Sequence, residues 1–235
     1  MTIRDQAVSP GPKISSLVRK MFEGRSCEVL EAGCGSMTHI QLPDRCHVTG
    51  LDISADQLSR NSHVHERIVA DLQSVDLEPK YDLTVCWNVL EHLEDPQLAL
   101  KNMVAGLRQG GVLVIAVPLR SSLKGWVTRL TPHCFHVAFY KWVLKREDAG
   151  LPGRQPFRAL MRREIGPHQM KKYLEALGVH EIYVCLYQTD HYTHLLTAGG
   201  VMSWLIKAAG ILTWLVSFGA VSWKWPDVVM VYRKP

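Results

Sequence analysis

Short apolar runs that alternate with helical patterns are the feature that most limits how this chain can fold. Seven such runs lie at 27–32, 47–53, 67–72, 81–89, 112–117, 181–188 and 227–233. Their apolar residues are continuous instead of alternating with polar ones, so both faces of each strand should be buried. Strands buried on both faces and separated by helices are typical of a parallel sheet covered by helices on both sides. We therefore expect an α/β fold built on a sheet of seven strands.

Glycines and carboxylates follow the first three strands in a fixed order. The first strand runs into Gly33 and Gly35, where the lack of a side chain lets the backbone approach a ligand closely. Asp52 ends the second strand, where a carboxylate can accept hydrogen bonds from ribose hydroxyls, and Asp71 follows the third. This order indicates a nucleotide-like ligand at the carboxyl ends of the strands. The dinucleotide fingerprint is incomplete, because Thr38 occupies the position of its last glycine.

The fourth strand and its continuation, YDLTVCWNVLEHLEDP at 81–96, closely resemble the matching segment of class I S-adenosylmethionine-dependent methyltransferases. Residues 29–36 resemble the first motif of that family and residues 107–118 its fifth-strand motif, so the likeness covers about residues 14–118. The resemblance implies S-adenosylmethionine as the cofactor and a Rossmann-like, mostly parallel sheet. It also implies that the C-terminal strand is antiparallel and lies next to the fifth strand.

The same resemblance implies which residues bind the cofactor. Ser36 stands where the family's motif usually has a third glycine, which is a modest departure. By resemblance, Glu31, Gly33, Cys34 and Gly35 would hold the methionine part and Asp52 the ribose, while Ile53, Asp71 and Leu72 would contact the adenine. Asn88 and Val89 would line the methionine side, with His92 nearby.

The net charge of +5 is distributed unevenly along the chain. Residues 1–119 hold 11 Lys and Arg against 15 Asp and Glu, whereas residues 120–172 hold 12 against 3. The basic segment coincides with a stretch, 119–166, that interrupts the alternation of strands and helices. We expect one methyltransferase domain over 1–235, with 119–166 as an aromatic, basic lid over the acceptor. The segment also contains Arg154, Arg158, Arg162 and Arg163. Three roles are open for these arginines: a solvated basic face, binding of an acidic group of the substrate, or contact with an anionic membrane.

Two histidines of this lid are the candidates for a catalytic general base. His133 and His136 are three residues apart, so a helix would place them on one face. Each is also compatible with a hydrogen-bonded structural role. No metal site is expected, because a third ligand is missing. His191 and His194, after the sixth strand, are alternative candidates for the same pocket.

A second insertion, 193–225, is strongly apolar. Its 29-residue run from Leu195 to Trp223 contains a single charge, Lys207. Drawn as a helix, the run has one narrow stripe of small and polar residues, and large apolar residues cover the rest. We expect a lid over an apolar substrate, a contact with a second copy of the chain, or a helix in a membrane interface. A membrane-spanning helix is disfavoured, because the chain must return to the sheet directly afterwards.

The segment after the fourth strand also narrows the class of acceptor. Methyltransferases of nucleic-acid amines typically carry an Asn/Asp-Pro-Pro-aromatic tetrad there, whereas this chain reads Asn88-Val-Leu-Glu91. We therefore expect no nucleic-acid partner. We predict in-line methyl transfer to a small apolar acceptor, most simply at oxygen, with an acceptor carboxylate as one option. Two alternatives stay open: C-methylation of a lipid quinone precursor, and a non-catalytic methyltransferase-like subunit that acts as a membrane scaffold.

The cysteines and the N-terminus bear on location. None of the six Cys forms a C-x-x-C pair, which favours reduced thiols, and the first residues lack the apolar core of a secretory signal. We expect a cytoplasmic protein. It would be peripheral at a membrane if the second insertion contacts lipid, and a homodimer if that insertion contacts a second copy.

Overall fold

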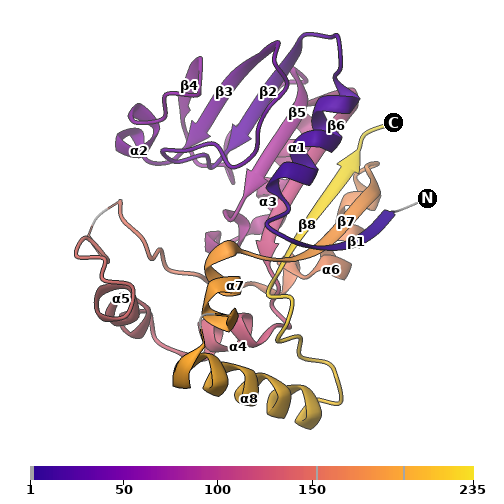
Figure 1. The fold of residues 1–235 in the computed structure, drawn as a ribbon. Helices are drawn as coiled ribbons and strands as arrows, with labels where there is room; N and C mark the ends of the chain where they lie inside the picture. Colours follow the sequence, from indigo (N-terminus) through magenta and orange to yellow (C-terminus); the bar gives the residue numbers. More distant parts are fainter. Residues whose placement is uncertain (1–2, 152, 198) are drawn as a thin grey trace.

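The computed structural model describes residues 3–151, 153–197 and 199–235. Its strands form one eight-stranded sheet with the order β1-β7-β8-β6-β5-β2-β3-β4. β8 is antiparallel to both neighbours, β6 and β7, and the other pairings are parallel, which confirms the α/β class and the antiparallel C-terminal strand (Figure 1). The strands are β1 (Ile3–Val8), β2 (Cys27–Ala32), β3 (Cys46–Asp52), β4 (Glu66–Val69), β5 (Tyr81–Trp87), β6 (Leu107–Pro118), β7 (His180–Gln188) and β8 (Asp227–Arg233).

β1 makes the sheet one strand larger than the expected seven. It lies at the edge and pairs in parallel with β7, with Ile3 opposite Tyr183 and Val8 opposite Gln188. An edge strand pairs on one side only and needs no continuous apolar run. Its partner lies far away in the sequence, so the polar segment IRDQAV gives no local sign of the pairing.

Helices lie on both faces of the sheet, as the continuous apolar strands require. Successive residues of β6 alternate between two cores: Leu113 belongs to the cluster that includes Met170 of α6, and Val114 to the cluster that includes Ile14 of α1. Full burial of one such side chain stabilises the fold by about 1.5–3 kcal/mol. The helices of the two layers are α1 (Gly11–Met21), α2 (Ala55–Ser59), α3 (Pro96–Gly106) and α6 (Pro167–Ala176), and two short 3-10 turns are η1 (Leu90–His92) and η2 (Arg163–Ile165).

Three helices begin at side chains that accept hydrogen bonds from free backbone N–H groups. Ser54 accepts from Gln57 at the start of α2. Asp95 accepts from two N–H groups at the start of α3, and Ser122 accepts from Gly125 at the start of the next helix, α4. Such caps typically contribute about 1 kcal/mol each and fix where the connecting loops turn.

The two insertions form helices beyond the carboxyl ends of the parallel strands (Figure 1). Segment 119–166 contains α4 (Leu123–Leu130) and α5 (His133–Trp142). The apolar segment contains two helices instead of one, α7 (Asp190–Thr197) and α8 (Gly200–Val216), and Gly199 before α8 has a φ of +72°. In the described part of the chain, every helix is too short or too polar to cross a membrane.

Candidate active site

The loop after β2 has a left-handed backbone at both of its glycines, a conformation that favours glycine. Gly33 and Gly35 have φ values of +69° and +52°. The N–H of Gly33 donates to the carbonyl oxygen of Leu51, which holds the loop against β3 at 2.6 Å. A Cβ on Gly33 would lie 2.4 Å from a methyl carbon of Val89, so the loop touches the segment that follows β5. The sequence-predicted residues of the first and fourth strands therefore meet here.

Asp52 connects the glycine loop to the end of β3. One carboxylate oxygen accepts the N–H of Gly35 and the other accepts the N–H of Ser54, each at 2.8 Å. A carboxylate oxygen can accept a second hydrogen bond, so both retain capacity for a ligand hydroxyl. The next residue, Ile53, exposes 72% of its surface, which leaves an apolar side chain open beside the carboxylate.

Asp71 and Leu72 lie after β4, and their side chains are already engaged. The Asp71 carboxylate accepts the backbone N–H of Gln73 at 2.9 Å and the side-chain amide of the same residue at 3.1 Å. Leu72 is buried, and its carbonyl oxygen accepts from the amide of Asn102. A ligand here would meet a carboxylate held rigidly by its own turn.

A cavity of about 700 Å³ joins the glycine loop to the lid. Its lining does not include Glu31, Asp52, Ile53, Asp71, Leu72 or Val89. Val89 lies close to Gly33 of the loop without lining the cavity. The predicted residues that share the cavity are Gly33, Cys34, Gly35, Asn88 and His92 from the sheet side, with His133 and His136 from α5. The sheet's carboxyl edge and the first insertion therefore enclose one space.

Glu31 and Cys34 are buried beside this loop. Glu31 accepts a hydrogen bond from the hydroxyl of Thr38 at 2.7 Å, and burial raises the pKa of its carboxyl to about 7. Burial also raises the pKa of the Cys34 thiol to about 12. Cys34 is therefore a neutral thiol at physiological pH and contributes shape instead of nucleophilic chemistry.

Glu91 is a site residue that sequence reasoning missed. Its side chain lines the cavity, only 5% of the residue is exposed, and Oε2 has no hydrogen-bond partner among the described residues. Burial raises the pKa of the Glu91 carboxyl to about 8, so it is mainly protonated at pH 7. The available signal was its place in the segment after the fourth strand, four residues after the end of β5.

Further buried polar groups come from the ends of β7 and β8. Asp227 is buried and forms an ion pair of 2.6 Å with Lys124 of α4, which also lines the cavity. The second oxygen of Asp227 and the hydroxyl of Tyr187 are buried without a partner among the described residues. Burial is the main cause that raises the pKa values of Asp227, Tyr187 and Glu91, and the charge of Asp227 adds to the increase at Tyr187 and Glu91. These groups therefore share one electrostatic environment.

The histidines of α5 face the cavity in a defined arrangement. The rings of His133 and His136 are 6.5 Å apart. Nε2 of His136 lies 2.9 Å from the hydroxyl of Thr131, whose own proton has an acceptor in the carbonyl of Val127 at 2.6 Å. Nε2–H of His136 is therefore the donor, and Nδ1 keeps a free lone pair. His194 is exposed on α7 and is not among the lining residues, while the side chain of His191 lies outside the described part of the chain.

His92 connects the sheet to the lid. Its Nδ1 lies 2.8 Å from the carbonyl oxygen of Arg158, so Nδ1–H donates and Nε2 is the unprotonated nitrogen. The ring meets Phe157 edge to face at 6.0 Å. Burial lowers the pKa of His92, which favours this neutral form. The side chain thus fixes the second half of the lid over the cavity.

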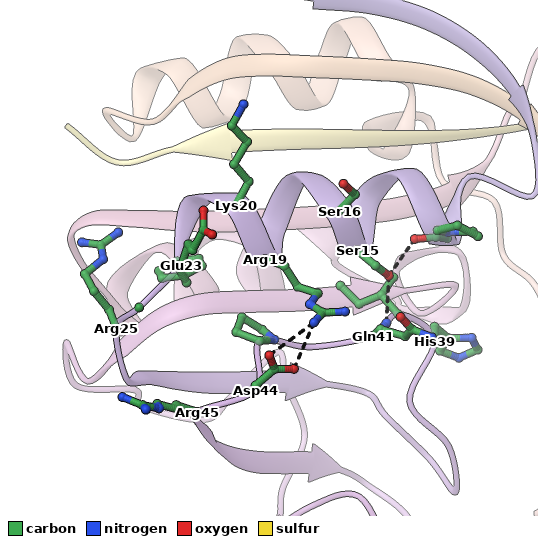
Figure 2. A pocket seen from close by; sticks show the side chains of 16 residues that line it. Ser15, Ser16, Arg19, Lys20, Glu23, Arg25, His39, Gln41, Asp44 and Arg45 are labelled. Carbon is green, nitrogen blue, oxygen red and sulfur yellow. Dashed lines mark hydrogen bonds and ion pairs between the residues drawn. The ribbon is translucent and has the colours of Figure 1, made fainter.

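A second cavity, of about 840 Å³, lies between α1 and the loop before β3 (Figure 2). Across it, Arg19 and Asp44 point toward one another and hydrogen-bond at 3.2 Å. The hydroxyl of Ser15 accepts the N–H of Gln41 at 2.9 Å. Among the residues that the structure describes, His39 alone lines both cavities, and polar groups of the helix and the loop bind one another, so we assign this cavity no part in the site.

Sequence comparison points to one family. Residues 30–113 match the family described as a methyltransferase domain. Over 95 residues, the chain is 30% identical to the ubiquinone biosynthesis O-methyltransferase of Coxiella burnetii, an alignment that covers 36% of this chain and 41% of that protein. The chain therefore spans less than half the length of this curated relative.

Solved structures share the fold over nearly the whole chain. An S-adenosylmethionine-dependent methyltransferase from Mesorhizobium loti superposes with a TM-score of 0.53 at 16% identity, covering 97% of this chain and 99% of that one. The N-methyltransferase NodS from Bradyrhizobium japonicum, in complex with S-adenosylhomocysteine, superposes with a TM-score of 0.51 at 16% identity, covering 95% and 86%. At these identities the likeness establishes the fold.

Proposed function

We propose that this chain, which carries a class I S-adenosylmethionine-dependent methyltransferase domain, transfers a methyl group to an oxygen of a small apolar acceptor. We treat residues 1–235 as one domain in which 119–166 covers the acceptor and 193–225 is an apolar accessory segment. The observation that carries the proposal is one cavity that is lined by the glycine loop and Glu91 from the sheet side and by His133 and His136 of α5. Similarity to a ubiquinone biosynthesis O-methyltransferase favours oxygen as the acceptor atom.

The residues around the glycine loop fit the cofactor. The backbone at Gly33 and Gly35 would contact its methionine part, and Asp52 would accept hydrogen bonds from its ribose. Ile53 and Asp71 would contact the adenine, since one offers an exposed apolar side chain and the other a carboxylate. When bound, the cofactor supplies a sulfonium methyl group that is already activated, so the chain needs mainly to align the acceptor.

Proton removal from an acceptor hydroxyl is assigned to α5. When bound, the cofactor would supply the methyl group and leave as S-adenosylhomocysteine, and the proton of the acceptor hydroxyl would pass to a base of this chain. We propose His136 for this role, because its Nδ1 keeps a lone pair while Nε2 is held by Thr131. Glu91, protonated below about pH 8, would donate a hydrogen bond that orients the acceptor. Such acid–base assistance is typically worth about 10²–10⁴ in rate.

The test is methyl transfer from labelled S-adenosylmethionine to apolar phenols, with and without a carboxylate. We expect O-methylated product, and we expect His136→Ala to lower kcat by about 10²-fold or more. His194→Ala, on α7, is the matched control and should leave kcat unchanged. Methylation at carbon would favour the quinone-precursor alternative. Undiminished turnover by His136→Ala would remove that residue from the mechanism.

A further inference from the structure

In α8 the small and polar side faces the protein and the large apolar side is exposed, which is the reverse of an amphipathic helix in a water-soluble domain. Its buried side is small and polar: Ser203 donates to the carbonyl oxygen of Leu196 at 2.6 Å, and Ser217 accepts the N–H of Val221 at 3.1 Å. Gly210 lies so close to Trp223 that a Cβ would be 2.8 Å from its side chain. The large apolar residues point outward and are exposed: Val201, Trp204, Leu205, Ile211, Leu212, Trp214, Leu215 and Val216, followed by Phe218.

Helices α4 and α5 lie at the same end of the molecule as α8 (Figure 1), and they also expose large apolar side chains. On α4 these are Trp126, Val127 and Leu130, and on α5 they are Phe135, Phe139 and Trp142. Single exposed apolar residues are ordinary, but gathered ones mark a surface that meets an apolar partner. We call the exposed apolar residues of α4, α5 and α8, together with Phe218, the apolar end.

The charges around the apolar end identify the partner. Residues 119–146 and 191–226 contain no Asp or Glu. A second copy docked through this end by two-fold symmetry would bring the same cations face to face. An anionic lipid surface would instead attract them, with Trp and Phe inserted at the level of the headgroups. Lys124 is already paired with Asp227, and the other cations of these segments are Arg120, Arg129, Lys141, Lys145, Arg146, Lys207 and Lys224.

We propose that the apolar end docks on an anionic lipid bilayer, with α8 lying in the plane of the interface. α8 has 17 residues, fewer than the roughly 20 that a spanning helix needs, so an interfacial position suits its length. The cavity is lined by Thr128 and Arg129 of α4 and by His133 of α5, so the helices that meet the membrane also line the cavity. An acceptor dissolved in lipid would then reach the site without crossing water. This last consequence rests on the proposed methyl transfer; membrane docking itself does not.

Vesicle flotation with the full chain tests the docking surface. The vesicles are phosphatidylcholine alone, or phosphatidylcholine with phosphatidylglycerol, and neither cofactor nor acceptor is added. We expect the chain to float with the anionic vesicles. The double variant Trp204→Ser/Leu212→Ser, which changes side chains that are 68% and 62% exposed, should bind at least about tenfold more weakly. Leu98→Ser, a change on α3 at a residue that is 44% exposed, should bind like the wild type.

A matched pair of lysine variants tests the electrostatic contribution to lipid binding. Lys207→Gln, on α8, should weaken binding to anionic vesicles by about fivefold, and Lys101→Gln, on α3, should not. S-adenosylhomocysteine binding and light scattering are measured on every variant, to verify the fold and the oligomeric state. Failure of the wild type to float with anionic vesicles would overturn the proposal. A wild-type dimer that Trp204→Ser/Leu212→Ser converts to monomer, with vesicle binding unchanged, would overturn it in favour of a second copy.

Discussion

At the residue scale, Gly33 combines a left-handed backbone with surroundings that leave no room for a side chain. We expect Gly33→Ala to lower the free energy of unfolding by about 2–4 kcal/mol, because it adds both φ strain and a clash with Val89. Gly110→Ala is the control: Gly110 has a φ of +77° and nothing within 4 Å of its Cβ position, so only the strain of about 1–2 kcal/mol applies. Denaturant unfolding measures both. The close contact between Gly33 and Val89 would be contradicted if both glycine variants lost the same free energy of unfolding. It would also be contradicted if adding Val89→Ala to Gly33→Ala restored none of that free energy.

The raised pKa of the Glu91 carboxyl predicts how the free energy of unfolding depends on pH. Its folded-state pKa, about 8, lies above the usual value of 4.5, so the folded protein holds a proton that the unfolded chain releases. The Glu91 contribution is therefore most favourable below about pH 4.5 and is lost as the pH rises through 8. The free energy of unfolding of Glu91→Gln, relative to that of the wild type, should rise between pH 4.5 and 8 by at most about 1.4 kcal/mol per pH unit. Glu94→Gln, an exposed control, should show no such trend; a flat Glu91→Gln difference would contradict burial of the carboxyl.

The limits of sequence reasoning are also visible among single residues. Asp52 and the two glycines carry their roles in local patterns, because strand ends and turns leave signatures in the chain itself. The sequence places Glu91 after the fourth strand but does not reveal its neutral state, which arises from burial and from Asp227, 136 positions away in the sequence. Glu91 of η1 and His136 of α5 line the same cavity only because segment 119–166 folds back toward the sheet.

At the scale of elements, the strands were the most predictable part. The expected run 227–233 coincides with β8, and 181–188 differs from β7 by one residue, since β-rich apolar segments flanked by turns are locally encoded. β1 was missed because only its pairing with β7 makes it a strand. The sequence pattern indicates the small, polar stripe of the second insertion. It does not indicate that this stripe faces the protein, because that depends on contacts with Trp223 and Leu196.

α8 gives the element-scale prediction. Gly210→Val places methyl groups where Trp223 lies, so we expect α8 to detach from segment 221–225 while the sheet stays folded. Ala209→Val, one residue earlier on the exposed side, has the same β-branched side chain and should leave the docking intact. Limited proteolysis should cleave α8 faster in the first variant only. Equal cleavage of both variants would show that α8 does not pack on the protein through Gly210.

At the scale of the whole molecule, three distant parts of the chain build one site. The glycine loop and β5 supply the sheet side of the cavity, α4 and α5 cover it, and Asp227 of β8 holds Lys124 of α4 in place. The glycine loop and helices α4 and α5 thus line the same cavity. Our proposals place cofactor binding at the glycine loop, acceptor binding at α5 and membrane docking at the apolar end, so each is tested with its own variants.

The central claim is that the carboxyl edge of this sheet binds S-adenosylmethionine through Asp52 and the glycine loop. Calorimetric titration with the product, S-adenosylhomocysteine, tests it most directly. We predict that the wild type binds and that Asp52→Ala lowers the affinity by about ten- to a hundredfold, the loss expected for hydrogen bonds to a charged group. Asp56→Ala, which removes an exposed carboxylate of α2 paired with Arg60, should bind like the wild type. No binding by the wild type, or equal binding by a folded Asp52→Ala variant, would contradict the account.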